Sequence, residues 1–457
     1  MAAAAAGQKM PPPDEQRIAH GIYKELIEIN SSVMTGATTP VAEAMAARFR
    51  QAGFSDSDIF LGGPTPKKFN LVVRYRGSGA RKPLLLLAHT DVVEARQEDW
   101  SPEIDPFKFT EKDGFFYGRG TADDKAQAAI WVANVLRYKR EGFKPDRDLI
   151  VALTADEEGG GYNGVRWLLD QHRDLIDADY ALNEGGGAEM VMGKRISLLV
   201  QVAEKYVMNF RVEVRNKGGH SSVPEPDNAI YQLAEGLQKL ARFSFPMKFN
   251  DVTRNYFTQL SKTETGPLAA SLKRVGEGDQ EAMRKVAAQY PRWNSMLRTT
   301  CVATMLEGGH ASNALPQLAA ATVNCRVMPD DSPEYVLETL QKAVGDEHVS
   351  VVASRTGSRP MSPGGVSTLR PDLMKQIMRL TDALWPGVVV VPSMSTGATD
   401  GKALRAAGIE TYGVSGLFNE RGDVRSHGKD ERMLAQSFYQ AQLFLYDLVK
   451  ALSGVVP

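Results

Sequence analysis

Two apolar runs, each followed directly by histidine or acidic residues, set the fold of this chain. Residues 84–91 read Leu-Leu-Leu-Leu-Ala-His-Thr-Asp, and residues 149–158 read Leu-Ile-Val-Ala-Leu-Thr-Ala-Asp-Glu-Glu. Short, continuous apolar runs of this kind predict strands that are buried on both faces of a sheet. Because active residues of open α/β sheets lie just past the carboxyl ends of the strands, the two segments also predict a polar site there.

Strands and helices alternate around the two runs. Expected strands cover 70–75, 84–88, 149–154 and 180–183, and expected helices cover 16–28, 40–52, 125–141 and 164–171. The same pattern returns after residue 358, with helices at 372–384, 401–407 and 431–452 and strands at 388–391 and 411–414. This alternation predicts an α/β fold with a mostly parallel sheet covered by helices.

The middle of the chain has a different pattern. Residues 206–214 alternate apolar and polar side chains, as a half-exposed antiparallel strand does. Further expected elements are a helix at 229–240, strands at 299–306, 319–327 and 348–353, and a helix at 333–344, with a polar stretch of no clear periodicity at 243–294. The resulting βαββαβ order predicts a ferredoxin-like α+β module.

The chain is thus expected to leave one domain, build a second and return to the first. Residues 1–203 and 356–457 would form the α/β domain, and residues 204–355 would form the inserted domain. The length of 457 residues points the same way, because it exceeds what a single hydrophobic core usually serves.

Composition argues against several classes of protein. The chain is 43% hydrophobic and 24% charged, which is typical of a soluble globular protein. Its net charge is −1 and it has no long Lys/Arg block, so nucleic-acid binding and a polybasic membrane surface gain no support. The apolar runs are far shorter than the roughly 20 residues that cross a bilayer, and we expect no membrane-spanning segment.

The compartment of the protein stays open at this point. The Ala-rich N-terminus at 1–8 is either the stump of a secretory signal, which favours a periplasmic or secreted protein, or a disordered cytoplasmic leader. The two cysteines, Cys301 and Cys325, lie at similar distances from a loop at 308–316 and could face each other across two strands. A disulfide there would favour an oxidising compartment. Because the sequence does not fix the strand register, two buried thiols are the favoured expectation.

Candidate metal ligands and proton carriers follow the predicted strands. His89 and Asp91 are two residues apart on an extended chain and so share a face, which suits a histidine ligand oriented by a carboxylate. Alone, such a triplet is more often a structural pair. Glu157 and Glu158 end a run of three carboxylates whose mutual repulsion a cation or full exposure would relieve. Adjacent glutamates also suit one metal ligand beside one proton shuttle.

Three more candidates complete the set. Asp123 stands in Gly-Arg-Gly-Thr-Ala-Asp-Asp-Lys at 118–125, where its ordinary alternative is to cap the helix that follows. Glu184 precedes three glycines, and His427 lies directly before the last predicted helix. Histidine, Asp and Glu without cysteine suit Zn²⁺, with Co²⁺ or Mn²⁺ as substitutes, and the ligands suffice for two ions. The chain has neither a His-Glu-x-x-His helix nor a serine-hydrolase elbow.

Together and in this order, the segments resemble the M20 family of metallopeptidases and aminoacylases over nearly the whole chain. The resemblance implies a zinc-peptidase-like catalytic domain with an inserted lid, through which two copies form a homodimer. It implies five ligands for two zinc ions: His89, Asp123, Glu158, Glu184 and His427. Asp123 would bridge the ions and precede a cis peptide bond. Asp91 would orient His89, and Glu157 would act as general base and acid.

Further residues match the family's lid and substrate loop. His220, in Gly-Gly-His-Ser-Ser-Val-Pro, matches the lid histidine that reaches into the partner's active site and stabilises the oxyanion. Asn313, Arg326 and Gly397 match substrate-binding positions, and Arg326 would form a bidentate pair with the substrate carboxylate. The glycine-rich loop around Gly397 departs from the family's commoner Ser-Gly-Gly-Thr-Asp by one threonine and one alanine.

The expected function is hydrolysis of the amide bond of a peptide or N-acyl-amino acid beside a free carboxylate. Glu157 would take a proton from a zinc-bridging water and pass it to the leaving amine. Residues 293–300 resemble the carboxypeptidase S-like and N-acyl-amino-acid hydrolase branch of the family. One alternative is a carnosinase-like dipeptidase, against which Glu184 and the enlarged lid weigh. The other is a metal-free binding relative, which would have lost a ligand or the base.

Overall fold

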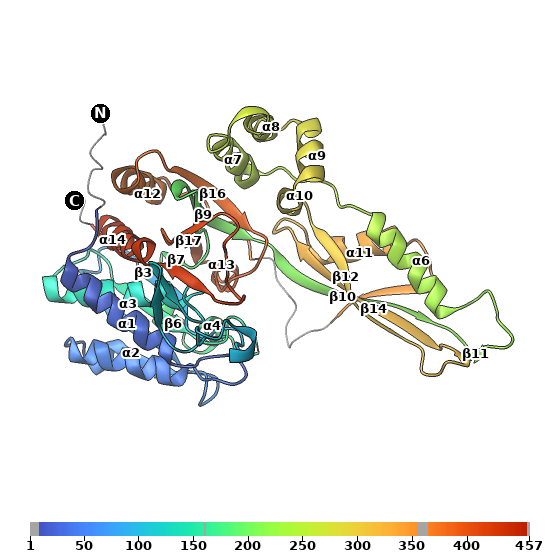
Figure 1. Ribbon diagram of the computed structural model, residues 1–457, viewed down its shortest axis with the longest axis horizontal. Coiled ribbons are helices and arrows are strands. Elements are labelled where there is room, and N and C mark those ends of the chain that lie inside the picture. Colours follow the sequence, from blue (N-terminus) through green and yellow to red (C-terminus); the bar gives the residue numbers. More distant parts are fainter. Residues whose placement is uncertain (1–8, 160, 355–363, 455–457) are drawn as a thin grey trace.

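Two sheets organise the chain, one of ten strands and one of four (Figure 1). The computed structural model describes residues 9–159, 161–354 and 364–454. The Ala-rich N-terminus and the predicted domain boundary at 355–356 lie outside these residues. Among the described residues, no helix combines the length and the apolar character that crossing a membrane requires.

The large sheet is parallel in its centre. Its strands are β1 (Ile59–Gly62), β2 (Asn70–Tyr75), β3 (Leu84–His89), β6 (Leu149–Thr154), β7 (Tyr180–Asn183), β8 (Ala188–Val191), β9 (Lys194–Glu204), β16 (Val389–Ser395), β17 (Glu410–Gly413) and β18 (Phe418–Glu420). Their order is β1-β2-β6-β3-β7-β17-β9-β8-β18, and β16 pairs with β9. β6, β3, β7 and β17 run parallel, whereas β2, β8 and β9 add antiparallel pairs. The predicted α/β class is confirmed, with a sheet that is mixed beyond its parallel centre.

Helices cover both faces of this sheet (Figure 1). They are α1 (Pro13–Glu28), α2 (Thr39–Gln51), α3 (Lys125–Glu141), α4 (Gly164–Gln171), α5 (Arg173–Ile176), α12 (Pro371–Leu384), α13 (Gly401–Ala406) and α14 (Ala435–Leu452). A small sheet of β4 (Thr110–Lys112), β5 (Phe115–Tyr117) and β19 (Arg432–Leu434) lies beside them. The last helix therefore begins four residues later than the sequence predicts, because a short strand precedes it.

The leucine run of β3 shows why its sequence is continuously apolar. Leu84 and Leu86 belong to the core that α1, α3 and α14 form on one face of the sheet. Leu85 and Leu87 belong to the core on the other face, under α4 and α13. All four side chains are at most 1% exposed, as expected for a central strand that is covered on both sides.

The second sheet has the predicted ferredoxin-like order. Its strands are β10 (Tyr206–Arg215), β12 (Thr300–Gly308), β14 (Leu318–Val327) and β15 (Val349–Ala353), arranged as β12-β14-β10-β15. The helices α6 (Ala229–Arg242) and α11 (Pro333–Val344) share one core with this sheet. A two-stranded ribbon of β11 (Gly219–His220) and β13 (Ala314–Leu315) extends from its far end (Figure 1).

The stretch at 243–294 differs from the prediction, which placed no elements there. It forms four helices: α7 (Asp251–Leu260), α8 (Gly266–Gly276), α9 (Gln280–Gln289) and α10 (Pro291–Leu297). Each contributes only a few apolar residues to its core, so no regular apolar spacing marks it in the sequence. Their core includes Leu199, Val389 and Val391 of the large sheet, so these helices pack on β9 and β16 rather than on the second sheet.

The two cysteines form a disulfide, and the favoured expectation of buried thiols is wrong. Cys301 and Cys325 face each other on β12 and β14, with their Cα atoms 4.1 Å apart. A β-bulge between Ala303 and Met305 shifts the register of the pair by one residue. Without it, Cys301 would lie opposite Arg326. Because a bulge of this kind leaves no clear mark in the sequence, the pairing could not be derived from spacing.

Candidate active site

Three neighbouring parallel strands carry the centre of the site. His89 ends β3, Glu157 and Glu158 follow β6, and Glu184 follows β7. Since β3 lies between β6 and β7 in the sheet, the carboxyl ends of all three strands meet at one edge. The candidate residues therefore lie together just beyond the strand ends, the position that active residues of open α/β sheets occupy.

His89 joins two carboxylates on one side of the site. Its Nε2 atom lies 3.0 Å from Asp123 Oδ1 and 3.8 Å from Glu184 Oε2. Its Nδ1 atom lies 3.0 Å from the backbone oxygen of Asp91 and 3.7 Å from the Asp91 carboxylate. The carboxylate of Asp91 accepts the backbone N–H groups of Glu157 and Glu158, at 3.1 and 3.0 Å. Asp91 thus holds both the histidine and the loop that follows β6.

His427 joins two carboxylates on the other side. Its Nε2 atom lies 2.7 Å from Glu158 Oε1 and 3.2 Å from Asp123 Oδ2. The two oxygens of Asp123 therefore face two different histidines, His89 and His427. The peptide bond between Asp123 and Asp124 is cis, as the family resemblance implies.

The charges of the cluster fit divalent cations. Burial, followed by the charge of Glu184, raises the pKa of Glu157 to about 11. Burial likewise raises the pKa of Glu184 to about 7, and hydrogen bonds to Asp123 and Glu158 raise that of His427 to about 10. Carboxylates crowded in this way hold protons unless a cation balances them. Two groups, His89–Asp123–Glu158 and His89–Glu157–Glu184, have their ligand atoms within 4.8 Å of one another, so the donors present suit a metal.

The carboxylate of Glu431, which sequence reasoning did not single out, connects the loop that carries Asp123 with the segment that follows His427. Glu431 is fully buried and accepts the backbone N–H groups of Gly120, Ala122 and Asp123. Its Oε2 atom also accepts a hydrogen bond from Nη1 of Arg119 at 2.6 Å. Glu431 stands four residues after His427, but nothing in the sequence distinguishes it from an ordinary acidic residue near a helix.

Asp400 is a second carboxylate that the sequence did not mark. It is buried and accepts hydrogen bonds from Thr154 Oγ1 at 3.2 Å and Asn163 Nδ2 at 2.6 Å. Burial raises its pKa to about 6, and its charge in turn raises the pKa of Glu157. It lies three residues after Gly397, in the same glycine-rich loop, and only the folded chain shows that this loop reaches the end of β6.

The lid residues lie apart from the cluster. His220 is exposed on β11, and its Nδ1 atom lies 2.7 Å from Ser222 Oγ. Asn313 is exposed on the facing loop, and its backbone oxygen accepts the N–H of Ser221. Arg326 is half-buried on β14, and Gly397 is exposed after β16. Within the described part of the chain, no hydrogen bond or ion pair joins these four residues to the histidines and carboxylates of the cluster.

The fold is that of metallopeptidases, and the histidines and carboxylates at its strand ends form a candidate metal site. The model of peptidase family M20/M25/M40 matches residues 85–451, and the chain belongs to this family. It is 29% identical to the human N-fatty-acyl-amino acid synthase/hydrolase PM20D1 over 86% of this chain and 79% of that protein. It is 27% identical to the probable carboxypeptidase S-like 2 of Dictyostelium discoideum over 84% of this chain and 74% of that protein.

A solved structure shows the same fold. The M20 family metallo-carboxypeptidase Sso-CP2 from Sulfolobus solfataricus superposes with a TM-score of 0.70 at 16% identity, over 96% of this chain and 99% of that one. The predicted resemblance to the M20 family, with its carboxypeptidase S-like and N-acyl-amino-acid hydrolase relatives, is confirmed. The chain is a hydrolase of this family.

Proposed function

We propose that the protein is a metal-dependent hydrolase that cleaves the amide bond of a peptide or N-acyl-amino acid beside a free C-terminal carboxylate. The observation that carries the proposal is the position of Asp123 between His89 and His427, with Glu157 beside them. The family match and the names of the relatives support an amide substrate.

The donors would hold two Zn²⁺ ions, with Co²⁺ or Mn²⁺ as substitutes. His89 and Glu184 would bind one ion, and Glu158 and His427 the other. Asp123 would contact both, since its two oxygens face different histidines. Bound there, the cations would lower the pKa of a water molecule and polarise the amide carbonyl.

Glu157 would move the proton. Its backbone is fixed by Asp91, which places the carboxylate beside Glu184 and Glu158. A carboxyl oxygen of Glu157 would accept a proton from the attacking water and then donate it to the leaving amine. Burial raises the pKa of Glu157, and once cations balance the neighbouring carboxylates, this effect would favour holding that proton between the two steps.

The second sheet would act as the lid. We assign residues 1–203 and 356–457 to the catalytic domain and residues 204–355 to the lid, although α7–α10 pack on the catalytic side. Arg326 would pair with the substrate carboxylate and Asn313 and Gly397 would contact the substrate. His220, exposed at the tip of the lid, would stabilise the oxyanion in a partner's site.

A substrate screen with and without Arg326 tests this function. We expect the zinc-loaded protein to hydrolyse N-acyl-amino acids that have a free carboxylate and to spare their C-terminal amides. Arg326→Met removes a bidentate, charge-assisted pair, so kcat/KM for the free acids should fall about 10- to 100-fold. Arg215→Met, an exposed arginine on β10 of the same sheet, is the control and should leave kcat/KM unchanged.

Other outcomes of the screen separate the alternatives. Cleavage of unblocked dipeptides, with no turnover of acylated amino acids, would replace the proposal by a carnosinase-like dipeptidase. Less than one metal ion per chain, in protein never exposed to chelator, would favour a metal-free binding protein.

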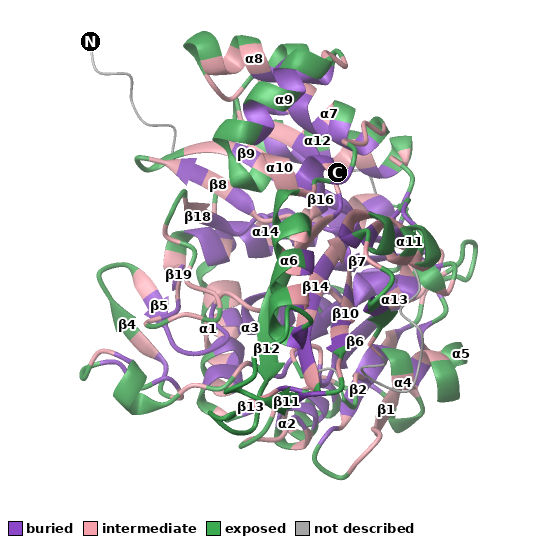
Figure 2. Cartoon of the chain, turned by 90° about the vertical axis from the view of Figure 1, so that its right-hand side faces the viewer, coloured by how far each residue is buried: buried purple, intermediate pink, exposed green. Residues whose placement is uncertain are grey.

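We also propose that two copies associate through β12. This strand is the edge of the second sheet, and it is exposed from Val302 to Gly308 (Figure 2). Met305 and Leu306 are 63% and 71% exposed, and Tyr231 on the neighbouring α6 is 65% exposed. An apolar edge strand of this kind pairs readily with another chain.

Oligomeric state measured by light scattering tests the association. Leu306→Glu should convert a dimer to a monomer, because it buries a charge in the proposed interface. Val352→Glu is the matched control, since Val352 is 47% exposed on β15, the opposite edge of the same sheet. A dimer that persists in Leu306→Glu would place the interface elsewhere.

A further inference from the structure

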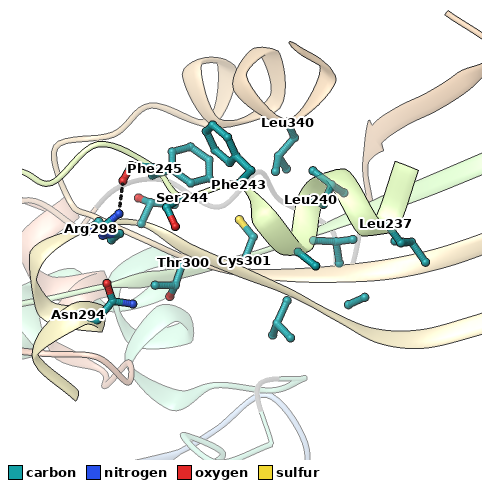
Figure 3. A pocket seen from close by; sticks show the side chains of 15 residues that line it. Leu237, Leu240, Phe243, Ser244, Phe245, Asn294, Arg298, Thr300, Cys301 and Leu340 are labelled. Carbon is teal, nitrogen blue, oxygen red and sulfur yellow. Dashed lines mark hydrogen bonds between the residues drawn. The ribbon is translucent and has the colours of Figure 1, made fainter. Parts of the chain in front are cut away.

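A half-open cavity of about 470 Å³ lies on the helix side of the second sheet (Figure 3). The end of α6, the chain that follows it, α10, α11 and the start of β12 surround it. Its volume falls within the range of about 300–1,000 Å³ that is typical of sites for small molecules.

The cavity is separate from the candidate active site. Cys301, Ala303 and Val323 line it, and the disulfide partner Cys325 belongs to the core shared with α6 and α11. Successive residues of a strand point to opposite faces, so Arg326 points away from the cavity. A molecule bound here would therefore not occupy the place proposed for the carboxylate of the substrate.

The cavity has an apolar end and a polar end. Leu237, Leu240 and Leu340, from the two helices, lie at one end. Arg298, Asn294 and Ser244 lie at the other, as Figure 3 shows. A ligand that fits both ends must combine a hydrocarbon portion with a polar head.

Arg298 indicates the charge of that head. Its Nη1 atom donates to the backbone oxygen of Phe245 at 3.0 Å, whereas its buried Nε atom has no hydrogen-bond partner. Within the described ranges, no carboxylate lies within 4.0 Å of this guanidinium. Burial lowers the pKa of Arg298, so the environment disfavours its charge. An anion bound in the cavity would supply the negative charge that pairs with this guanidinium.

We propose that this cavity binds a medium-chain fatty acid, with its carboxylate at Arg298 and its alkyl chain along Leu240. The charge of Arg298 selects the carboxylate, and the leucines and the aliphatic wall of β12 and β14 accept the chain. The site requires neither the metal cluster nor turnover, so it stands apart from the proposed function.

Calorimetric titration of the metal-loaded protein with dodecanoate, below its micelle concentration, tests the site. We expect one dodecanoate per chain, with much weaker binding of dodecanol, which lacks the charge, and of butyrate, which lacks the chain. Arg298→Met should weaken dodecanoate about 10- to 100-fold. Arg242→Met, an exposed arginine at the end of α6, should bind it as the unchanged protein does.

Leu240→Trp gives a second measure, because it fills the apolar end and should abolish binding. Equal affinities of the Arg298→Met and Arg242→Met proteins, or of dodecanoate and dodecanol, would overturn the proposal. So would a failure of the unchanged protein to bind dodecanoate together with a change of oligomeric state in the Leu240→Trp protein, which would make a second copy of the chain the occupant. The titration measures binding alone, so its result stays informative even if the chain proves to hydrolyse no acetylated amino acid.

Discussion

Glu157→Gln is expected to keep its fold and its metal yet lose about 10²- to 10⁴-fold in kcat, the range typical of general acid–base groups. Glutamine preserves the shape of the side chain, and its backbone N–H would still reach the carboxylate of Asp91. It cannot accept the proton of the attacking water or return one to the amine. Steady-state kinetics on an N-acyl-amino acid, with metal content measured on the same sample, provides the readout.

The adjacent residue supplies the control for this prediction. Glu158 lies 2.7 Å from His427 and is assigned to metal binding, so Glu158→Gln should lose metal affinity together with activity. The Glu157→Gln and Glu158→Gln proteins should thus differ in metal content, although both should lose turnover. Turnover of Glu157→Gln within tenfold of the unchanged protein would show that another group carries the proton.

The central strands were predictable because of their burial. β6 and β7 begin and end at the predicted residues, and β3 is one residue longer than predicted, because it ends at His89. A strand covered on both faces must be apolar at every position, and the first polar residue then marks its end. The same rule places His89, Glu157 and Glu184 at one edge of the sheet, which is why the cluster could be foreseen from sequence.

Other features depend on contacts that no local pattern encodes. The helices α7–α10 contribute a few apolar residues each to a core that is completed by Leu199 and Val391, far away in the sequence. The bulge at Ala303–Met305 decides that Cys301 meets Cys325. Long-range packing sets both, and periodicity within a short window does not report it.

Removing the carboxylate of Glu431 should disturb both the stability of the fold and the binding of metal. In Glu431→Ala, Arg119 would keep a buried charge without its partner, and the N–H groups of Gly120, Ala122 and Asp123 would lose their acceptor. Breaking a buried ion pair in this way costs about 3–5 kcal/mol. We expect a clear fall in the midpoint of thermal unfolding.

Glu431→Gln separates positioning from stability. Glutamine retains one oxygen for the backbone N–H groups but loses the charge that faces Arg119, so the loop that presents Asp123 should become less well fixed. Groups that orient metal ligands typically change metal affinity about 10- to 100-fold, and competition with a chelator measures this change.

Asp430→Asn is the matched control, because Asp430 is the preceding residue and its carboxylate accepts hydrogen bonds from Ser101 rather than from the Asp123 loop. If the two variants lose metal equally, the effect belongs to the whole segment between His427 and β19. If only Glu431→Gln loses it, one buried carboxylate couples the ligand loops on either side of the site.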